Sequence, residues 1–246
     1  MFLVEGPQAV REVLAFHPEI VGELYLTPAA LERHGRLVAT AAERSLQVET
    51  VSEAVIEAMA DTVTPQGVVA VCRQPEVGLD AVLRPGARLV AILDEVRDPG
   101  NAGTIIRAAD AAGADGVVVT RSSVDVFNPK VVRSTTGSLF HLPVAQGVDR
   151  EEAIAAARAA GLQVLAADVS GVDLPELDDR MARPTAWLFG NEARGLDDAT
   201  LGLVEHVVKV PIYGHAESMN LATAASVCLY QTAFAQRIAA RRGEGS

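Results

Sequence analysis

Short, largely apolar segments alternate with amphipathic ones from residue 89 onward, and this alternation constrains the fold more than any other feature of the chain. Three of the apolar segments are LVAILDEV at 89–96, DGVVVT at 115–120 and TAWLFG at 185–190. A strand this apolar is buried on both faces, which favours a parallel sheet with helices on both sides. The amphipathic segments and a last helix at about 218–242 can supply those helices. We therefore predict an α/β domain with a parallel sheet at 89–246.

A smaller alternation of the same kind precedes this domain. The apolar segments FLVE, GELYLT, LQVET and VVAVC alternate with amphipathic ones, including a helix expected at 28–44, and predict a compact α/β unit. The following stretch at 74–88 contains two prolines and two glycines, as is typical of a linker. We therefore expect a first domain at 1–73, a linker at 74–88 and the larger domain at 89–246.

Composition narrows the class of protein. The formal net charge of −11 argues against a protein that coats nucleic acid non-specifically, although one local basic cleft remains compatible with it. The N-terminus lacks a signal peptide layout and no apolar run reaches the roughly 18 residues of a membrane helix, so we expect a cytoplasmic protein without a membrane partner. Cys72 and Cys228 lie in apolar contexts and the histidines lack paired spacing, so we expect free thiols and no metal.

A polar segment that begins with two closely spaced glycines, Gly100 and Gly103, follows the first strand of the larger domain. It reads DPGNAGTIIRAADAAGADGVVV at 98–119, and we expect a loop as far as Gly103 with a helix after it. Such a turn can present backbone N–H groups to an anion. The spacing of Gly100 and Gly103 is not G-x-G-x-x-G, so a nicotinamide-dependent oxidoreductase is a weak match. Arg107 has apolar neighbours, which favours a functional cation over the plainer alternative of a solvated helix charge.

A second polar segment, FGNEARGL at 189–196, follows the apolar strand TAWLF. Gly190 would let a ligand approach the backbone closely, and Glu192 places a carboxylate at the carboxyl edge of the sheet, where ligands bind in open α/β folds. Taken alone, the segment fits an ordinary surface turn with a solvated carboxylate equally well.

The third polar segment, VPIYGHAESMNLATAASVCLY at 210–230, lies between a strand end and the last helix. A helix that begins near Ser218 puts the Ser218 hydroxyl and the Asn220 amide at its positive N-terminal end. By itself, Ser218 is better explained as an N-cap. Three loops after three strands, each with polar or charged groups, nevertheless indicate one shared site.

The ordered set NAGTIIRAA, LFGNEARGL and VPIYGHAESMNLATA resembles the three sequence motifs of the SpoU/TrmH branch of the SPOUT RNA methyltransferases. The shared pattern is an Asn and an Arg six residues apart, a G-x-E before a glycine, and a P-x-x-G-x-x-x-S-x-N block before the last helix. The resemblance covers residues 89–242. The opening FLVEGPQAV resembles the small ribosomal-protein-like RNA-binding domain of many members, in which a basic helical segment usually comes first; this sequence starts without one.

The resemblance implies a fold that periodicity does not reveal. Members thread the C-terminal region through a loop to form a deep trefoil knot, against the general rules of topology. They bind S-adenosylmethionine in the knot, mainly through backbone groups, and act as homodimers. By position, the resemblance implies that the cofactor contacts Gly190, Val210, Ile212 and Met219, with Met219 standing where leucine is more usual.

The implied reaction is transfer of a methyl group from S-adenosylmethionine to a ribose 2′-hydroxyl of RNA. Arg107 would activate that hydroxyl, and we favour an electrostatic role because a guanidinium is so rarely deprotonated. Asn101 would orient Arg107 and the ribose. Glu192, Ser218 and Asn220 would complete the hydrogen-bonded pocket around the reacting nucleotide.

The RNA partner follows from the resemblance only in outline. Arg133, in NPKVVRSTTGSLF, matches another family arginine, which implies contact with an RNA phosphate near Arg107; an ordinary charged helix residue is the alternative. The two-domain layout favours ribosomal RNA, because tRNA enzymes of this group more often use terminal helical extensions. A tRNA 2′-O-methyltransferase and a non-catalytic RNA-binding or ribosome-assembly protein on the same fold are the alternatives, and the second would need degraded motifs.

Overall fold

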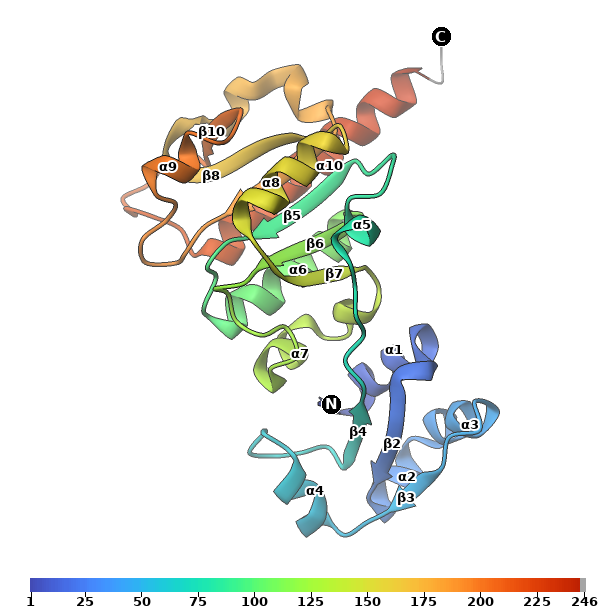
Figure 1. Ribbon diagram of the computed structural model, residues 1–246. Helices are drawn as coiled ribbons and strands as arrows, with labels where there is room; N and C mark the ends of the chain where they lie inside the picture. The colour runs from blue at the N-terminus through green and yellow to red at the C-terminus, as the bar shows by residue number, and fades with distance from the viewer. Residues whose placement is uncertain (244–246) are drawn as a thin grey trace. The chain divides into compact units, whose positions relative to one another are not determined.

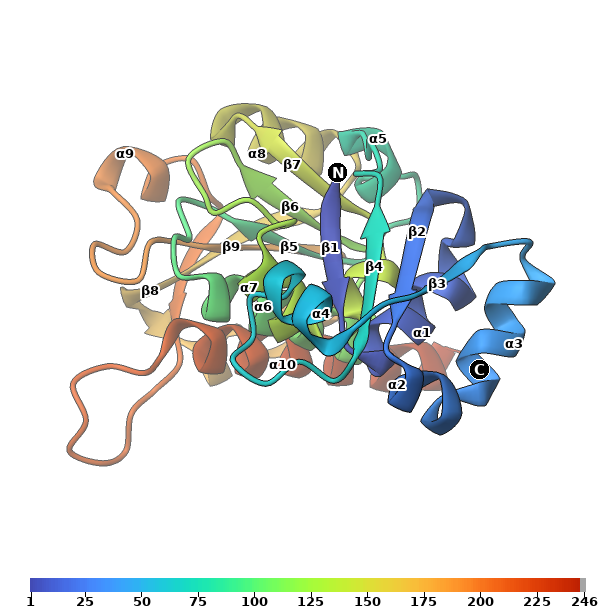
Figure 2. The ribbon, with the colours of Figure 1, turned by 90° about the horizontal axis from the view of Figure 1, so that it is seen from below.

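The structure is a computed structural model that describes residues 1–243, and it divides the chain into two compact units (Figures 1 and 2). The first unit combines Met1–Glu76 with Asp125–His141, and the second combines Val77–Val124 with Leu142–Ser246. Each unit is built around a sheet of its own. Within residues 1–243, no helix has the length and apolar character needed to cross a membrane.

The first unit contains a four-stranded sheet in the order β1-β4-β2-β3. Strand β4 (Val68–Cys72) pairs antiparallel with β1 (Phe2–Glu5) and β2 (Val21–Leu26), whereas β2 pairs parallel with β3 (Val48–Thr50). The helices of this unit are α1 (Pro7–Phe16), α2 (Pro28–Arg33), α3 (Gly35–Glu43), α4 (Glu53–Met59) and α7 (Pro129–Thr135), with 3-10 segments at Pro18–Ile20 and Ser138–Phe140. This mixed sheet with its helices confirms the predicted small α/β unit.

Two features of the first unit differ from the sequence prediction. The helix expected at 28–44 is broken at His34, whose backbone leaves the helical region with φ −115° and ψ 41°. The segment Asp125–His141, which was assigned to the larger domain, belongs to this unit instead. The reason is aromatic packing, because Phe127 and Phe140 bring their rings to 4.6 Å and 6.4 Å from the ring of Phe2.

The second unit contains a six-stranded, all-parallel sheet in the order β10-β8-β9-β5-β6-β7. Its strands are β5 (Leu89–Leu93), β6 (Gly116–Thr120), β7 (Val144–Val148), β8 (Gln163–Asp173), β9 (Thr185–Phe189) and β10 (His206–Lys209). Its helices are α5 (Leu79–Val82), α6 (Pro99–Ala112), α8 (Arg150–Ala159), α9 (Asp198–Leu201) and α10 (Leu221–Gly243), with a 3-10 segment at Leu174–Ala182. The predicted parallel sheet is therefore confirmed.

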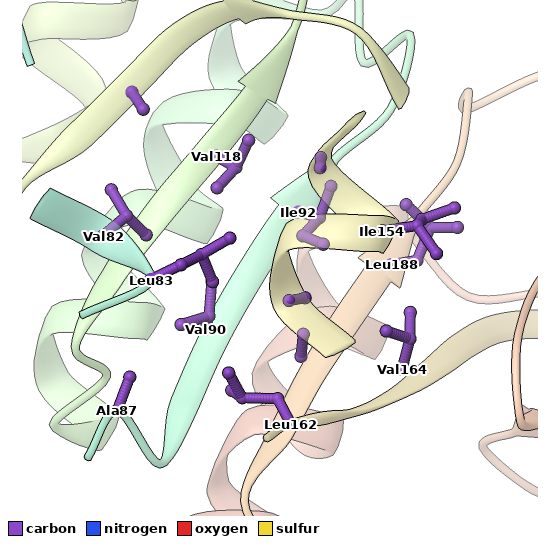
Figure 3. Close-up of a cluster of buried hydrophobic side chains, with 14 of the residues drawn as sticks. Val82, Leu83, Ala87, Val90, Ile92, Val118, Ile154, Leu162, Val164 and Leu188 are labelled. Atoms are coloured by element: carbon purple, nitrogen blue, oxygen red, sulfur yellow. The ribbon is translucent and has the colours of Figure 1, made fainter. Parts of the chain in front are cut away.

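Both faces of this sheet are covered, which explains why its central strands are so apolar. On one face, Ile92 and Leu188 join Ile154 of α8 in a buried cluster (Figure 3). The opposite face packs against α10, which Figure 1 shows behind the sheet while α8 lies in front of it. There the fully buried Trp187 donates its indole N–H to the hydroxyl of Thr232 at 2.9 Å. Covered on both faces, the central strands can have no polar side.

Three boundaries in the second unit differ from those predicted. The expected linker contains α5, whose Val82 is fully buried in the cluster of Figure 3. Helix α6 begins at Pro99, so the glycines placed in a loop lie in its first turns. Asp98 explains this start, because its carboxylate accepts the Asn101 backbone N–H at 2.7 Å and Pro99 suits a first helical position. Helix α10 begins at Leu221 rather than near residue 218.

Candidate active site

The segments that follow β5 and β9 meet at the carboxyl edge of the second unit's sheet. The two strands pair in parallel with Leu93 opposite Phe189, so the loops after them begin side by side. The backbone N–H of Asp94 continues this pairing by donating to the Phe189 carbonyl at 2.8 Å. Parallel pairing therefore brings the loop that carries Glu192 to the start of α6.

A chain of hydrogen bonds joins the three motif segments. The side-chain amide of Asn101 donates to the Glu192 carboxylate at 3.3 Å, and the amide of Asn220 donates to the Asn101 side-chain oxygen at 2.9 Å. We call this chain, Glu192–Asn101–Asn220, the polar relay. It joins one residue from each of the three polar segments, so these segments lie together at the edge of the sheet.

Glu192 is held at the N-terminal end of α6. Its two carboxylate oxygens accept the backbone N–H groups of Asp98 at 3.0 Å and Arg97 at 3.2 Å. Partial burial raises the pKa of Glu192, but these N–H groups and the Asn101 amide stabilise the carboxylate more, so its pKa lies below the ordinary value. Glu192 is thus an anchored anion at neutral pH.

Asn220 caps the last helix. Its side-chain oxygen accepts the backbone N–H groups of Ala222 at 2.9 Å and Thr223 at 3.2 Å, which is the bonding of an N-cap. The prediction that Ser218 occupies this position is therefore wrong, since the chain from 210 to 220 is an extended loop before α10 (Figure 2). Ser218 does not cap the helix, and it lines the neighbouring cavity.

A cavity of about 360 Å³ lies between the loop after β9 and the loop before α10. Three predicted cofactor positions, Val210, Ile212 and Met219, line it, as do Glu192 and Ser218. Residues that the sequence prediction missed also line it, namely Asp168, Asn191, Arg194 and Lys209. Asp168 had a usable signal, because it ends the apolar segment LQVLAAD and so reaches the same edge of the sheet. The lining combines apolar and charged groups of both signs.

Gly190 allows a tight turn of the chain and does not line the cavity. It is buried, and a Cβ atom at this position would lie 2.7 Å from Cγ of Leu196 and 2.8 Å from the carbonyl carbon of Gly195. Only glycine fits between these atoms without movement of the backbone. Gly190 therefore allows the close return of the chain that places residues 191–195 beside the cavity.

Arg107 lies exposed on α6 and does not line the cavity. Among the residues that the structure describes, its guanidinium has no hydrogen-bond or ion-pair partner. The expectation that Asn101 orients Arg107 is not met, because the Asn101 side chain is bonded to Glu192 and Asn220 instead. Arg107 is thus a cation left available to a ligand.

Arg133 belongs to the first unit, so its predicted neighbourhood with Arg107 stays a prediction. Its guanidinium lies 3.4 Å from the nearly buried carboxylate of Glu5 and 2.7 Å from the exposed carboxylate of Asp61. It also lines a cavity of about 320 Å³ in this unit, together with Gln8 and Thr62.

Neither unit offers a metal centre within the described chain. Residues 1–243 contain no group of three or more His, Cys, Asp or Glu side chains arranged to hold a metal ion. Both cysteines are buried free thiols, and burial raises the pKa of Cys72 and Cys228 to about 12. Neither is therefore a reactive thiolate at neutral pH.

Comparison with protein families assigns both parts of the chain. The model of the SpoU rRNA methylase family matches residues 88–230, which include the polar relay and the whole cavity lining. A model described as RNA 2′-O ribose methyltransferase substrate binding matches residues 3–78.

Named relatives match nearly the whole chain. The 23S rRNA (guanosine(2553)-2′-O)-methyltransferase RlmP of Bacillus subtilis is 37% identical, over 93% of this chain and 87% of its own length. The 23S rRNA (uridine(2479)-2′-O)-methyltransferase of Streptomyces viridochromogenes is 38% identical, over 80% of this chain and 70% of its own.

Solved structures share the fold. The SpoU methyltransferase AviRb from Streptomyces viridochromogenes, in complex with the cofactor AdoMet, superposes with a TM-score of 0.81 and 34% identity, covering 97% of this chain and 91% of its own. An AdoMet-bound rRNA methyltransferase from Sinorhizobium meliloti gives a TM-score of 0.79 and 35% identity, over 94% of this chain and 86% of its own.

The anchored charge of Glu192 predicts a pH-dependent contribution to stability. A carboxylate with a lowered folded pKa stabilises the fold above its ordinary pKa of 4.5, and this contribution is lost as the pH falls through the folded value. Glu192→Gln should therefore lower the free energy of unfolding by about 1 kcal/mol at neutral pH, and the deficit should shrink in acid. Urea denaturation at a series of pH values measures it.

Glu217→Gln provides the matched control. Glu217 is exposed on the 210–220 loop and makes no hydrogen bond or ion pair with the described part of the chain. It should show no pH-dependent deficit. A Glu192→Gln deficit that stays constant with pH would contradict the anchoring of the carboxylate.

Proposed function

The chain belongs to the SpoU rRNA methylase family, and we propose that it transfers a methyl group from S-adenosylmethionine to a ribose 2′-hydroxyl of ribosomal RNA. The observation that carries this proposal is the polar relay, which joins all three motifs beside one cavity. A non-catalytic protein on this fold is expected to have degraded motifs, whereas Asn101, Arg107, Glu192, Ser218 and Asn220 are all present.

The cavity suits S-adenosylmethionine in size and chemistry. Its volume of about 360 Å³ falls within the usual range for cofactor sites. Val210, Ile212 and Met219 offer apolar contacts to an adenine ring, while Asp168 and Lys209 offer opposite charges to a cofactor that itself carries both signs. When bound, this cofactor supplies an electrophilic methyl group on a sulfonium.

Arg107 is the group that we assign to the RNA hydroxyl. Its exposed guanidinium, which has no partner within residues 1–243, can hold the phosphate beside the reacting ribose and lower the pKa of the 2′-hydroxyl by its charge. The fixed anion Glu192 and the two asparagines keep the loops around the ribose in place. Proton removal is thus assisted by electrostatics and positioning rather than by a strong base.

The substrate we propose is 23S rRNA. Two relatives of nearly equal identity are named for a guanosine and a uridine of 23S rRNA, so the RNA and the 2′-position are common to them and the base is not. A tRNA substrate is the second candidate, because some relatives carry the broader name tRNA/rRNA methyltransferase. The cytoplasmic location and the trefoil knot predicted from the sequence belong to the same proposal.

Replacement of Arg107 tests the chemistry. With tritiated S-adenosylmethionine and unmodified 23S rRNA, Arg107→Ala should lower kcat by about 100-fold, the scale of losing one charge-stabilising group. Binding of the cofactor, measured by titration calorimetry, should be unchanged because Arg107 does not line the cavity. Arg107→Lys should recover part of the rate, since it keeps the charge but not the forked geometry.

The control is Arg241→Ala, which removes an exposed arginine from the last turn of α10 and should keep full activity. Mapping of the product by primer extension identifies the nucleotide. Label on a base instead of a 2′-hydroxyl would overturn the assignment, and a wild type that binds no S-adenosylmethionine would favour the non-catalytic alternative.

For the first unit, we propose that Arg133 contacts RNA from the cavity of about 320 Å³. Support comes from the substrate-binding family model at 3–78, which includes the cavity residues Glu5, Gln8 and Thr62, while Arg133 itself lies in the 88–230 match. The guanidinium already faces the carboxylates of Glu5 and Asp61, so a phosphate must compete with the more exposed of them, Asp61.

Because of this competition, two substitutions should change the affinity for RNA in opposite directions. Arg133→Ala should weaken RNA binding and reduce the salt dependence by about one counterion, because one phosphate contact is lost. Asp61→Asn should strengthen binding, because it frees the same guanidinium. Fluorescence anisotropy with labelled RNA at several salt concentrations measures both. Equal weakening by both variants would indicate that Arg133 only stabilises the unit.

We further propose that the active form is a homodimer. Helix α10 leaves three large apolar side chains substantially exposed, with 38% of Val227, 53% of Phe234 and 50% of Ile238 accessible. Exposed apolar groups on one helix favour association with a second copy. Light scattering should give the dimer mass for the wild type and a smaller mass for Phe234→Glu. Val63→Glu, at a 98% exposed position of the first unit, should leave the mass unchanged.

A further inference from the structure

Glu95 adopts a backbone conformation that side-chain-bearing residues usually avoid. It is the second residue after β5 and has φ of 53°, in the left-handed region where glycine is the usual residue. This conformation costs a non-glycine residue about 1 kcal/mol or more, and it persists only when surrounding contacts enforce it. The contacts of Glu95 therefore show which interactions hold it in this conformation.

The backbone of Glu95 fixes the turn that follows β9. Its N–H donates to the hydroxyl of Thr120 at 3.2 Å, and its carbonyl accepts the side-chain amide of Asn191 at 2.8 Å. The side-chain oxygen of Asn191 in turn accepts the backbone N–H groups of Ala193 at 3.0 Å and Arg194 at 3.2 Å. One carbonyl of Glu95 thus orients the residue around which the 191–195 turn is built.

The carboxylate of Glu95 holds the same turn from its other side. One oxygen lies 2.6 Å from the guanidinium of Arg194, and the other lies 3.3 Å from that of Arg150. Arg150 is itself fixed by the buried Asp94 at 2.8 Å and by Asp197 at 3.3 Å. The anchor behind Glu95 is therefore a charge cluster on the sheet edge rather than a mobile surface pair.

We propose that Glu95 is a positioning residue that shapes the cofactor cavity by clamping Asn191 and Arg194 in its wall. The inference rests on the proposed function, because the cavity that Asn191 and Arg194 line is the one assigned to S-adenosylmethionine. A residue with the backbone freedom of glycine but no carboxylate could supply the carbonyl bond alone. A glutamate supplies both halves of the clamp, namely the carbonyl bond to Asn191 and the carboxylate pair with Arg194, but its backbone is strained.

Three variants test the carboxylate half of the clamp, because all of them keep the Glu95 carbonyl that accepts from Asn191. Glu95→Gln keeps the side-chain shape and removes the charge, Glu95→Gly relieves the backbone and removes the carboxylate, and Arg194→Gln removes the exposed partner. Each should weaken S-adenosylmethionine binding about tenfold in titration calorimetry and raise its KM, with kcat at saturating cofactor little changed. The double variant Glu95→Gln/Arg194→Gln should bind no more weakly than Glu95→Gln alone, because that change already breaks the pair with Arg194 along with those to Arg150 and Arg97.

A readout without cofactor distinguishes positioning from a general loss of stability. Amide hydrogen exchange of Ala193, Arg194 and Gly195 should accelerate in the Glu95 variants, while exchange in the central strands stays as in the wild type. Glu151→Gln, an exposed carboxylate in the first turn of α8, is the matched control and should change neither quantity.

The outcomes separate the failure of this inference from the failure of the proposed function. A wild type that binds no S-adenosylmethionine removes the cofactor assignment and this inference with it. A wild type that binds, with Glu95→Gln and Glu95→Gly binding equally well, overturns the positioning role alone. Additive losses in the double variant, or unchanged exchange of the 191–195 turn, also overturn it.

Discussion

The parallel pairing of β5 with β9 is the constraint on which the rest of the site depends. Because Leu93 lies opposite Phe189, both strands end at the same level, and the chain must turn twice in one small volume. Asp94 extends the pairing by one more bond to the Phe189 carbonyl. Glu192 reaches the start of α6 only through this arrangement. A shift of register between the two strands would separate the relay residues and move the cavity wall.

Three side chains link the N-terminal ends of two helices, α6 and α10, at the site. Glu192 satisfies free N–H groups at the start of α6, and Asn220 satisfies those at the start of α10. Asn101 bonds to both, and it can do so because an amide is a donor and an acceptor at once. These three residues are occupied with one another, whereas Arg107 lies exposed on α6. In our proposal, the relay residues stabilise the site and Arg107 contacts the substrate.

Much of the fold and the place of the site could be predicted from patterns along the chain. Wholly apolar strands predicted a doubly covered parallel sheet, and polar groups at strand ends predicted a shared site at the carboxyl edge. Two of the errors were of one kind, because in each a local signal was outweighed by a better local partner. Ser218 is a good N-cap by residue type, but Asn220 is closer to the helix start and bonded to Asn101. Glycine predicted a loop where the Asp98 cap and Pro99 begin a helix.

The sequence by itself determined the class of fold, the three motifs and the family, since these follow from periodicity and residue order. Only the tertiary structure decided which groups bond: that Asn101 serves Glu192 rather than Arg107, that residues 125–141 complete the first unit, and that Glu95 bears backbone strain beside the cavity. The physical reason is the separation of the interacting residues along the chain. Periodicity reports which face of an element is buried, whereas partners about ninety residues apart meet only once strand order and register are set.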